Sequence, residues 1–377
     1  MELTTDLTNL ALGALALGPA PAQAPPDSLV FPEDLDAWRR WEASHHRLRR
    51  AKGAVAGALR PSAPPVPDDV LVTRGPRPTV LVVVDAPTST QGAALVAPLD
   101  HLDDVAVACP RSVVEHLPGP PESWTTTALT SAAVAARLAA VHTVLAAGSY
   151  LPLGAGAHRW ARRHGARFVV VQHGLLTPFM APLPAGAHLL AWSEADAAFW
   201  ASGRTDITHE VIGSQLMWRA AQEGRLAPST VVAGARPTFL GQLHGVELAR
   251  SYMERVSREF CLMTGARYRP HPSEKDKLSR LTHALWHQVG ITIDPGTTPL
   301  FATGSPVVSV FSTGVLEAAA RGIPAWVHSP GAPDWVDAFH NRYTMARWEQ
   351  DSATSTPPPA IPEVEPARAA ALAVTIT

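Results

Sequence analysis

From Thr79 onwards the chain alternates short apolar runs with segments of helical character. The first run, TVLVVVD, is nearly continuous in valine and leucine, which is typical of a strand buried on both faces. Strand–helix alternation predicts a parallel sheet with helices on its faces. Five further runs follow in the first half: DVAVACP, VHTVLAAG, RFVVVQHG, HLLAWS and THEVIGS.

A second round of alternation starts near Val231. Its expected strands are TFLGQLHG, ARYRP, ITID, VVSVFS and IPAWVH, with helical stretches between them. The predicted fold class is therefore α/β, with two tandem Rossmann-like domains that face a cleft. We expect an acceptor domain at 79–225 and a nucleotide-donor domain at 231–350. Ligands of such folds bind outside the carboxyl ends of the strands, so polar residues there are the functional candidates.

Four further segments flank these domains. Residues 1–30 are rich in proline and alanine and lack the early positive charge of a signal peptide, which predicts a flexible arm. Residues 31–60 are expected to form a basic helical segment. Prolines cluster in 61–78 and in 351–377, which are expected to be a linker and a disordered tail.

Charge and composition limit the possible partners. The formal net charge of −2 gives no global attraction for DNA. No run of about 18 apolar residues exists, so no transmembrane helix is expected. The two cysteines lack metal-ligand spacing, which fits a reduced, cytoplasmic protein. Between Trp38 and Lys52, however, the sequence contains six Lys or Arg residues and only one Glu. This stretch is either an ordinary solvated face or a surface for an anionic acceptor or the inner face of the membrane.

His271 is the first candidate binding residue of the second half. It lies between Pro270 and Pro272 in the sequence RYRPHPSE, where a strand is expected to end. Each proline fixes its own φ and favours extended geometry in the residue before it, so His271 is held stiffly. We interpret this as an imidazole aimed at a phosphate, with Arg269 as a further cation. A purely structural turn is the alternative.

A second candidate is the strand–turn–helix sequence VVSVFSTGVLEAAARGIP. Ser312 or Thr313 can cap the helix, whose first N–H groups and dipole attract a phosphate. Capping without any ligand is the alternative interpretation. Gly241, His244 and Glu317 are further candidates for substrate binding.

The first half offers two candidates for catalysis. His173 ends the run VVVQHG, and Asp85 ends TVLVVVD. If the second domain holds a donor, the first should supply a base near the incoming nucleophile. His173 is the preferred base and Asp85 its rival. The structural alternatives are a histidine bonded to nearby backbone and an aspartate that caps a helix.

Three motifs carry a resemblance: RYRPHPSE, FSTGVLEAAARGIPAWV and VVVQHG. They resemble motifs of GT-B-fold bacterial surface-polymer transferases, namely CDP-glycerol glycerophosphotransferases of teichoic-acid synthesis and polysialyltransferases. The resemblance is confined to short motifs within residues 79–345. It implies that His271, Ser312 and Thr313 bind the phosphates of a cytidine nucleotide, and that His173 is the base. The acidic D/E-D/E-G element of polysialyltransferases has no clear counterpart, which argues against sialyl transfer.

The expected function is a metal-independent glycosyltransferase or polyol-phosphate transferase that needs no cofactor. Its donor would be activated by CDP, CMP or UDP, and its acceptor would be a glycan or a lipid-linked molecule in the synthesis of a cell-envelope polysaccharide or teichoic-acid-like polymer. Two alternatives stay open. One is a sugar-nucleotide epimerase of the same shape, with Glu317 and Asp85 as its acidic candidates. The other is a non-catalytic RNA-binding protein that uses the basic helix, although no RNA-recognition signature accompanies it.

Overall fold

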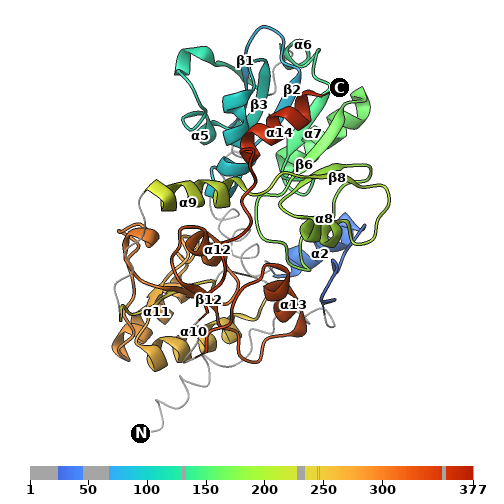
Figure 1. Ribbon diagram of the computed structural model, residues 1–377. Coiled ribbons are helices and arrows are strands. Elements are labelled where there is room, and N and C mark those ends of the chain that lie inside the picture. Colours follow the sequence, from blue (N-terminus) through green and yellow to red (C-terminus); the bar gives the residue numbers. More distant parts are fainter. Residues whose placement is uncertain are drawn as a thin grey trace, which may run out of the picture.

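The computed structural model describes residues 24–45, 68–129, 133–226, 234–243, 245, 247–349 and 354–376 of the 377. These residues form one sheet of eight strands and one of four, each with helices beside it. Figure 1 shows the first sheet above the second, with α9 (Gln215–Leu226) between them and the red C-terminal segment running from the second domain back to the first. The predicted α/β class is confirmed, and the two rounds of strand–helix alternation form two separate sheets.

The first sheet has the strand order β4-β1-β3-β2-β5-β6-β7-β8. All neighbours from β3 to β8 are parallel, whereas β1 pairs antiparallel with both β3 and β4. The strands are β1 (Asp69–Arg74), β2 (Val80–Val83), β3 (Val105–Pro110), β4 (Thr125–Ala128), β5 (Thr143–Ala146), β6 (Arg167–Val171), β7 (His188–Ala191) and β8 (Thr208–Val211).

Both faces of this sheet are buried. Leu81 and Val83 belong to one apolar cluster, while Val80 and Val82 belong to another, because successive side chains of a strand point to opposite faces. The helices of this half are α2 (Leu35–His45), α4 (Ser89–Gln91), α5 (Arg111–Val114), α6 (Ala133–Arg137), α7 (Pro152–His164), α8 (Glu194–Ala201) and α9 (Gln215–Leu226), with shorter helical turns at Gly92–Val96, Ala97–His101 and Pro121–Ser123.

The second sheet is smaller and entirely parallel, in the order β10-β9-β11-β12. Phe239, Phe260 and Tyr268 are fully buried in its apolar cluster. The run ITID, expected as a strand, makes only one bridge, between Ile293 and Tyr268. The elements are β9 (Thr238–Leu240), α10 (Arg250–Thr264), β10 (Arg267–Arg269), α11 (Lys277–Gln288), a 3-10 turn (Leu300–Ala302), β11 (Val307–Ser309), α12 (Thr313–Ala320), β12 (Ala325–Val327) and α13 (Asp334–Arg342).

The C-terminal segment returns to the first domain, so the prediction of a disordered tail is wrong for its described part. Helix α14 (Pro366–Thr375) buries four alanines and Val374, and three of these alanines join an apolar cluster of the first sheet together with Val374. An alanine-rich stretch with apolar periodicity follows the prolines, and such a stretch readily forms a helix. Gln215 at the start of α9 holds it: its amide donates to Glu365 at 2.6 Å and accepts from the N–H of Ala367 at 2.9 Å.

The expected linker at 61–78 is also wrong in its described part. Asp69–Arg74 forms β1, and Val70, Leu71 and Val72 are buried. The prolines flank this strand rather than interrupt it, so they leave its hydrogen bonds intact. Residues 1–23 and 46–67, which hold most of the expected arm and part of the basic segment, lie outside the described residues.

Residues 24–45 pack against the protein. Leu29 is buried and its N–H donates to the Ser202 hydroxyl, so the expected flexible arm ends earlier than residue 30. Trp38 is buried, and its indole N–H donates to the carbonyl of Phe179 at 2.8 Å. Trp41 stacks on the Phe179 ring at 5.1 Å. The expected membrane contact is therefore wrong for these two tryptophans, because their rings face the interior.

A buried polar cluster joins the two domains. The Tyr343 hydroxyl, just after α13, donates to Asp196 at 2.6 Å and accepts from the N–H of Leu176 at 2.8 Å. Arg342 donates to the carbonyl of Leu176 and lies 3.7 Å from Asp196. The second domain therefore holds both backbone groups of Leu176, three residues after His173.

Candidate active site

Strand order marks one place in each sheet where a ligand is expected. In the first sheet, the chain leaves β2 for β3 on one side and later adds β5 on the other. In the second sheet, the chain leaves β9 for β10 on one side and later adds β11 on the other side. Ligands of open α/β sheets bind at such switch points, outside the carboxyl ends of the strands.

Asp85 follows β2 at the first switch point. One carboxylate oxygen accepts from the N–H of Leu153 at 3.0 Å, so Asp85 caps the first turn of α7. The other oxygen is buried and has no hydrogen-bond partner among the described residues. Burial raises the pKa of Asp85, while its bonds to the start of α7 oppose that shift. The capping that was the structural alternative is present, and it occupies only one of the two oxygens.

His173 follows β6 and lies beside Tyr150, which follows β5. The Tyr150 hydroxyl is 3.4 Å from Nε2 of His173, whereas Nδ1 is buried and has no hydrogen-bond partner within the described part of the chain. Burial lowers the pKa of His173, and the nearby backbone of Val171 offsets part of that shift. Burial, together with the charge of Asp85, raises the pKa of Tyr150. A neutral imidazole and a protonated phenol therefore lie side by side at neutral pH.

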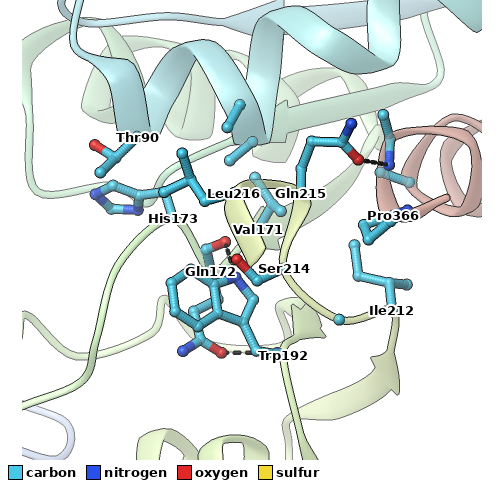
Figure 2. A pocket seen from close by; sticks show the side chains of 15 residues that line it. Thr90, Val171, Gln172, His173, Trp192, Ile212, Ser214, Gln215, Leu216 and Pro366 are labelled. Atoms are coloured by element: carbon cyan, nitrogen blue, oxygen red, sulfur yellow. Dashed lines mark hydrogen bonds between the residues drawn. The ribbon is translucent and has the colours of Figure 1, made fainter. Parts of the chain in front are cut away.

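A small cavity of about 10 Å³ adjoins His173 at the carboxyl ends of β6, β7 and β8. Figure 2 shows His173 beside Thr90, with Ser214 and Trp192 farther along the lining. The buried amide of Gln172 fixes this edge: it accepts from the N–H of Trp192 at 2.8 Å and donates to the carbonyl of Gly174 at 3.1 Å. His173 thus follows a residue whose side-chain oxygen and nitrogen are both hydrogen-bonded.

A larger cavity of about 530 Å³ lies between the two domains. Thr88 and Ser89, at the start of α4, line one side, and Glu317 of α12 with Arg321 just past its end line the other. Burial raises the pKa of Glu317, opposed by Arg321 at 3.8 Å. Both cavities have Ala93 and Leu216 in their linings, so they are adjacent.

A helix contact gives this cavity its third wall, α9. A Cβ at Gly224 of α9 would lie 2.8 Å from the Cα of Arg321 and 3.0 Å from its carbonyl oxygen. Only glycine lets the two helices approach this closely. Arg219 and Glu223 of α9 also line the cavity, and Glu223 pairs with Arg321.

At the second switch point, side chains tie the loops after β9 and β11 together. The Gln242 amide donates to the carbonyl of Phe311 at 2.6 Å and accepts from its N–H at 3.2 Å. The Ser312 hydroxyl accepts from the N–H of Gly314 at 3.2 Å, which confirms the predicted helix cap. Thr313 and Glu317 are four residues apart, so the capped end of α12 shares a face with the cavity-lining carboxyl.

Glu274 organises the loops after β9 and β10. This side chain is buried, and it accepts from the N–H groups of Leu243 at 3.0 Å and His271 at 3.2 Å. Its other oxygen accepts from Tyr268 and His283, each at 3.0 Å. These bonds hold the pKa of Glu274 below its usual value although burial acts in the opposite direction.

Gly241 is required by the same packing. A Cβ at this position would lie 2.3 Å from the Tyr268 hydroxyl and 2.8 Å from Glu274. The predicted role of Gly241 in substrate binding remains a prediction, but a structural reason for glycine is clear.

His271 is held by its neighbours, as its two flanking prolines suggest. Nδ1 accepts from the N–H of Ser273 at 3.1 Å, so the ring orientation is set within the loop. Burial lowers the pKa of His271, partly opposed by Glu274. Arg269 forms a 3.1 Å ion pair with Asp294, which neutralises part of its charge. His244 lies outside the described residues.

Two residues in this arrangement were missed from the sequence: Tyr150 and Glu274. Glu274 stands inside the motif RYRPHPSE, where its role as a buried acceptor gave no local signal. Within the described ranges, no three His, Cys, Asp or Glu side chains gather as a metal-binding group. The helices of those ranges include none long and apolar enough to cross a membrane.

No protein-family model matches the chain, and no curated protein matches it in sequence. Solved structures resemble it at low identity. UDP-GlcNAc 2-epimerase of Methanocaldococcus jannaschii is 12% identical, with a TM-score of 0.42, over 78% of this chain and 99% of that one. The HepE protein of Anabaena in complex with UDP is 15% identical, with a TM-score of 0.42, over 78% and 94%. A glycosyltransferase of Rickettsia africae is 12% identical, with a TM-score of 0.42, over 79% and 87%.

Proposed function

We propose that this chain is a transferase that moves a nucleotide-activated sugar or polyol phosphate to a hydroxyl of a glycan or lipid-linked acceptor. The observation that carries the proposal is the cavity of about 530 Å³ between the domains. It is lined by residues after β2 in one domain and by Glu317 of α12 in the other, whereas the capped end of α12 at Ser312 and Thr313 is not part of its lining. Two substrates can meet there, each held by a different sheet.

The second domain would bind the donor. The capped N-terminus of α12 offers N–H groups and the positive end of a helix dipole to a phosphate. Ser312 and Thr313 lie at that end, and the Glu317 face of the same helix borders the cavity. His271, fixed by Glu274 and Ser273, would stabilise the negative charge that grows on the departing nucleotide.

The first domain would activate the acceptor. His173 is uncharged near neutral pH because burial lowers its pKa, so its nitrogen can take the proton from an attacking hydroxyl. Tyr150 beside it would orient the ring. Asp85, whose second oxygen is unpartnered, remains the rival base.

A sugar-nucleotide epimerase is a second candidate that one observation favours. Glu317 is a carboxyl with a raised pKa inside the interdomain cavity, which is the property needed to exchange a sugar proton. The two functions differ in their products. An epimerase releases an epimer without any acceptor, whereas a transferase turns over only when an acceptor is present.

Thermal unfolding in the presence of CMP, CDP, UDP, GDP and their sugar or glycerol conjugates tests the proposal. A nucleotide at a hundred times its dissociation constant stabilises the folded state by about 2.7 kcal/mol, which is a measurable rise in Tm. We expect a cytidine or uridine nucleotide to give the largest shift, and Ser312→Asp to remove it. If none of these compounds raises the Tm, the proposed donor site is wrong.

A further inference from the structure

Helix α11 places its polar side chains inward and its leucines outward. Ser279, Thr282 and Trp286 are buried, and His283 bonds the buried Glu274. A different side of the helix is exposed and apolar. Its side chains are Leu278, Leu281 and Leu285, exposed by 46%, 57% and 52%, together with Val289 just past the helix end, exposed by 50%.

The inner face is polar because it serves a hydrogen-bond network. Ser279 accepts from Arg250, and the Thr282 hydroxyl donates to Glu254 at 3.3 Å. These bonds attach α11 to α10, so α11 cannot turn its leucines inward without breaking them. The apolar stripe is therefore a fixed feature of the surface.

The stripe is a cluster rather than a scatter. Eleven large apolar side chains are exposed in the described parts of the chain, and four of them are these neighbours on one side of α11. Single exposed leucines need no explanation, but a contiguous apolar patch marks a contact surface.

Charge selects the partner. Helix α11 contains Lys277 and Arg280 but no Asp or Glu, and Lys275 precedes it. Asp276, the nearest acid, accepts from the first N–H groups of the helix as its cap. Leucines beside cations are the pattern of a helix that lies in the interface of an anionic bilayer. We propose that α11 docks this protein on a membrane surface rich in anionic lipid.

A second copy of this chain fits the stripe less well. From Leu278 to Val289 the stripe is about 17 Å long, and one helix is about 10 Å wide. That area is on the order of 170 Å² per partner, whereas stable interfaces bury about 800 Å² per partner. A bilayer imposes no such minimum, because flanking cations add their attraction to that of the buried leucines.

Sedimentation of the full chain with lipid vesicles tests this proposal, whatever reaction the protein catalyses. We expect binding to vesicles that contain about 40% phosphatidylglycerol and much weaker binding to vesicles of pure phosphatidylcholine. Leu281→Asp with Leu285→Asp should weaken the partition coefficient at least about tenfold, because each buried leucine contributes a large part of the apolar attraction. Lys277→Glu with Arg280→Glu should remove the preference for anionic lipid.

Leu372→Asp is the matched control, since Leu372 is exposed by 52% on α14 of the other domain. It should leave vesicle binding unchanged, and thermal unfolding should show that each variant is folded. The proposal is overturned if the wild type does not bind the anionic vesicles, or if the paired leucine variant binds as well as Leu372→Asp does. A dimer in solution that the leucine variant alone dissociates would assign the stripe to a second copy instead.

Discussion

The strand ends of the two domains differ in how completely their polar groups are bonded. In the first domain, one oxygen of Asp85 and Nδ1 of His173 are buried and have no hydrogen-bond partner among the residues that the structure describes. In the second, both oxygens of Glu274 are bonded, and Gln242 bonds both backbone groups of Phe311. The one exception among the described strand ends there is the buried hydroxyl of Ser309, the last residue of β11, which has no hydrogen-bond partner. Unpaired buried groups with shifted pKa values are typical of reacting residues, whereas fully bonded networks make a rigid grip. The comparison suggests chemistry in the first domain and binding in the second.

Removal of the Glu274 carboxylate should cause the largest loss of stability among the variants that test this difference between the domains. Glu274→Ala leaves four donors without their acceptor, including the paired His283. We expect a loss of about 3–5 kcal/mol in the free energy of unfolding. Urea unfolding measures this loss. Glu259→Ala, which removes an exposed i,i+4 ion pair of α10, should change stability by less than about 0.5 kcal/mol. Similar losses of stability in both variants would contradict a stabilising role for the hydrogen-bond network around Glu274 in the second domain.

The contact between the domains gives the next effect. Tyr343→Phe leaves Asp196 and the N–H of Leu176 buried without the hydroxyl, at a cost of about 2 kcal/mol. Tyr252→Phe is the matched control, because the Tyr252 hydroxyl is buried without a partner in the described structure. It should be neutral or slightly stabilising. Equal behaviour of the two variants in urea unfolding would contradict the interdomain contact.

The pH response of His173 sharpens the difference between the domains. Burial lowers its pKa below the ordinary 6.5, so the folded state binds this proton less well than the unfolded chain does. Stability contributed by this residue is therefore present above pH 6.5 and is lost as the pH falls through 6.5 towards the folded pKa. NMR titration of the imidazole, assigned with His173→Gln, measures the pKa directly. A midpoint above 6.5 would remove the argument for a neutral base.

The helix cap should give the smallest effect on stability and a clear one on binding. Ser312→Ala removes the cap of α12 and should cost about 1 kcal/mol. Ser312→Asp keeps a capping oxygen but adds a negative charge where the phosphate is proposed to bind. We therefore expect nearly unchanged urea unfolding but a lost nucleotide-induced Tm shift. A retained shift in Ser312→Asp would place the phosphate elsewhere.

Much of the fold could be predicted because the strands of both sheets carry local apolar runs. Two of the elements that the sequence analysis did not predict lie among prolines. The strand Asp69–Arg74 is flanked by prolines. The helix Pro366–Thr375 follows a proline-rich segment that connects the two domains. The density of proline predicts a linker at 61–78 and a disordered tail at 351–377, yet residues 69–74 contain no proline and the helix contains only Pro366, at its first position.

The candidate site was less predictable, because its partners are distant in sequence. His173 and Ser312 lie at strand ends, as local pattern indicated, although their roles stay predictions. Gln242 bonds a residue 69 positions away, and the Tyr343 hydroxyl bonds Leu176 across 167 positions. No local periodicity reports such contacts, since they arise only when the sheets and the two domains pack.

Calorimetric titration of one nucleotide into two variants tests the central division most directly. The nucleotide is the one that gives the largest Tm shift, and the variants are His173→Ala and His271→Ala, each checked for folding by circular dichroism. We expect His271→Ala to raise the dissociation constant of the nucleotide by at least about tenfold. This is the order expected when a charge-assisted hydrogen bond to phosphate is lost. His173→Ala should leave it within about threefold while turnover falls by about 10²–10⁴-fold. Loss of nucleotide binding in His173→Ala with intact binding in His271→Ala would contradict it.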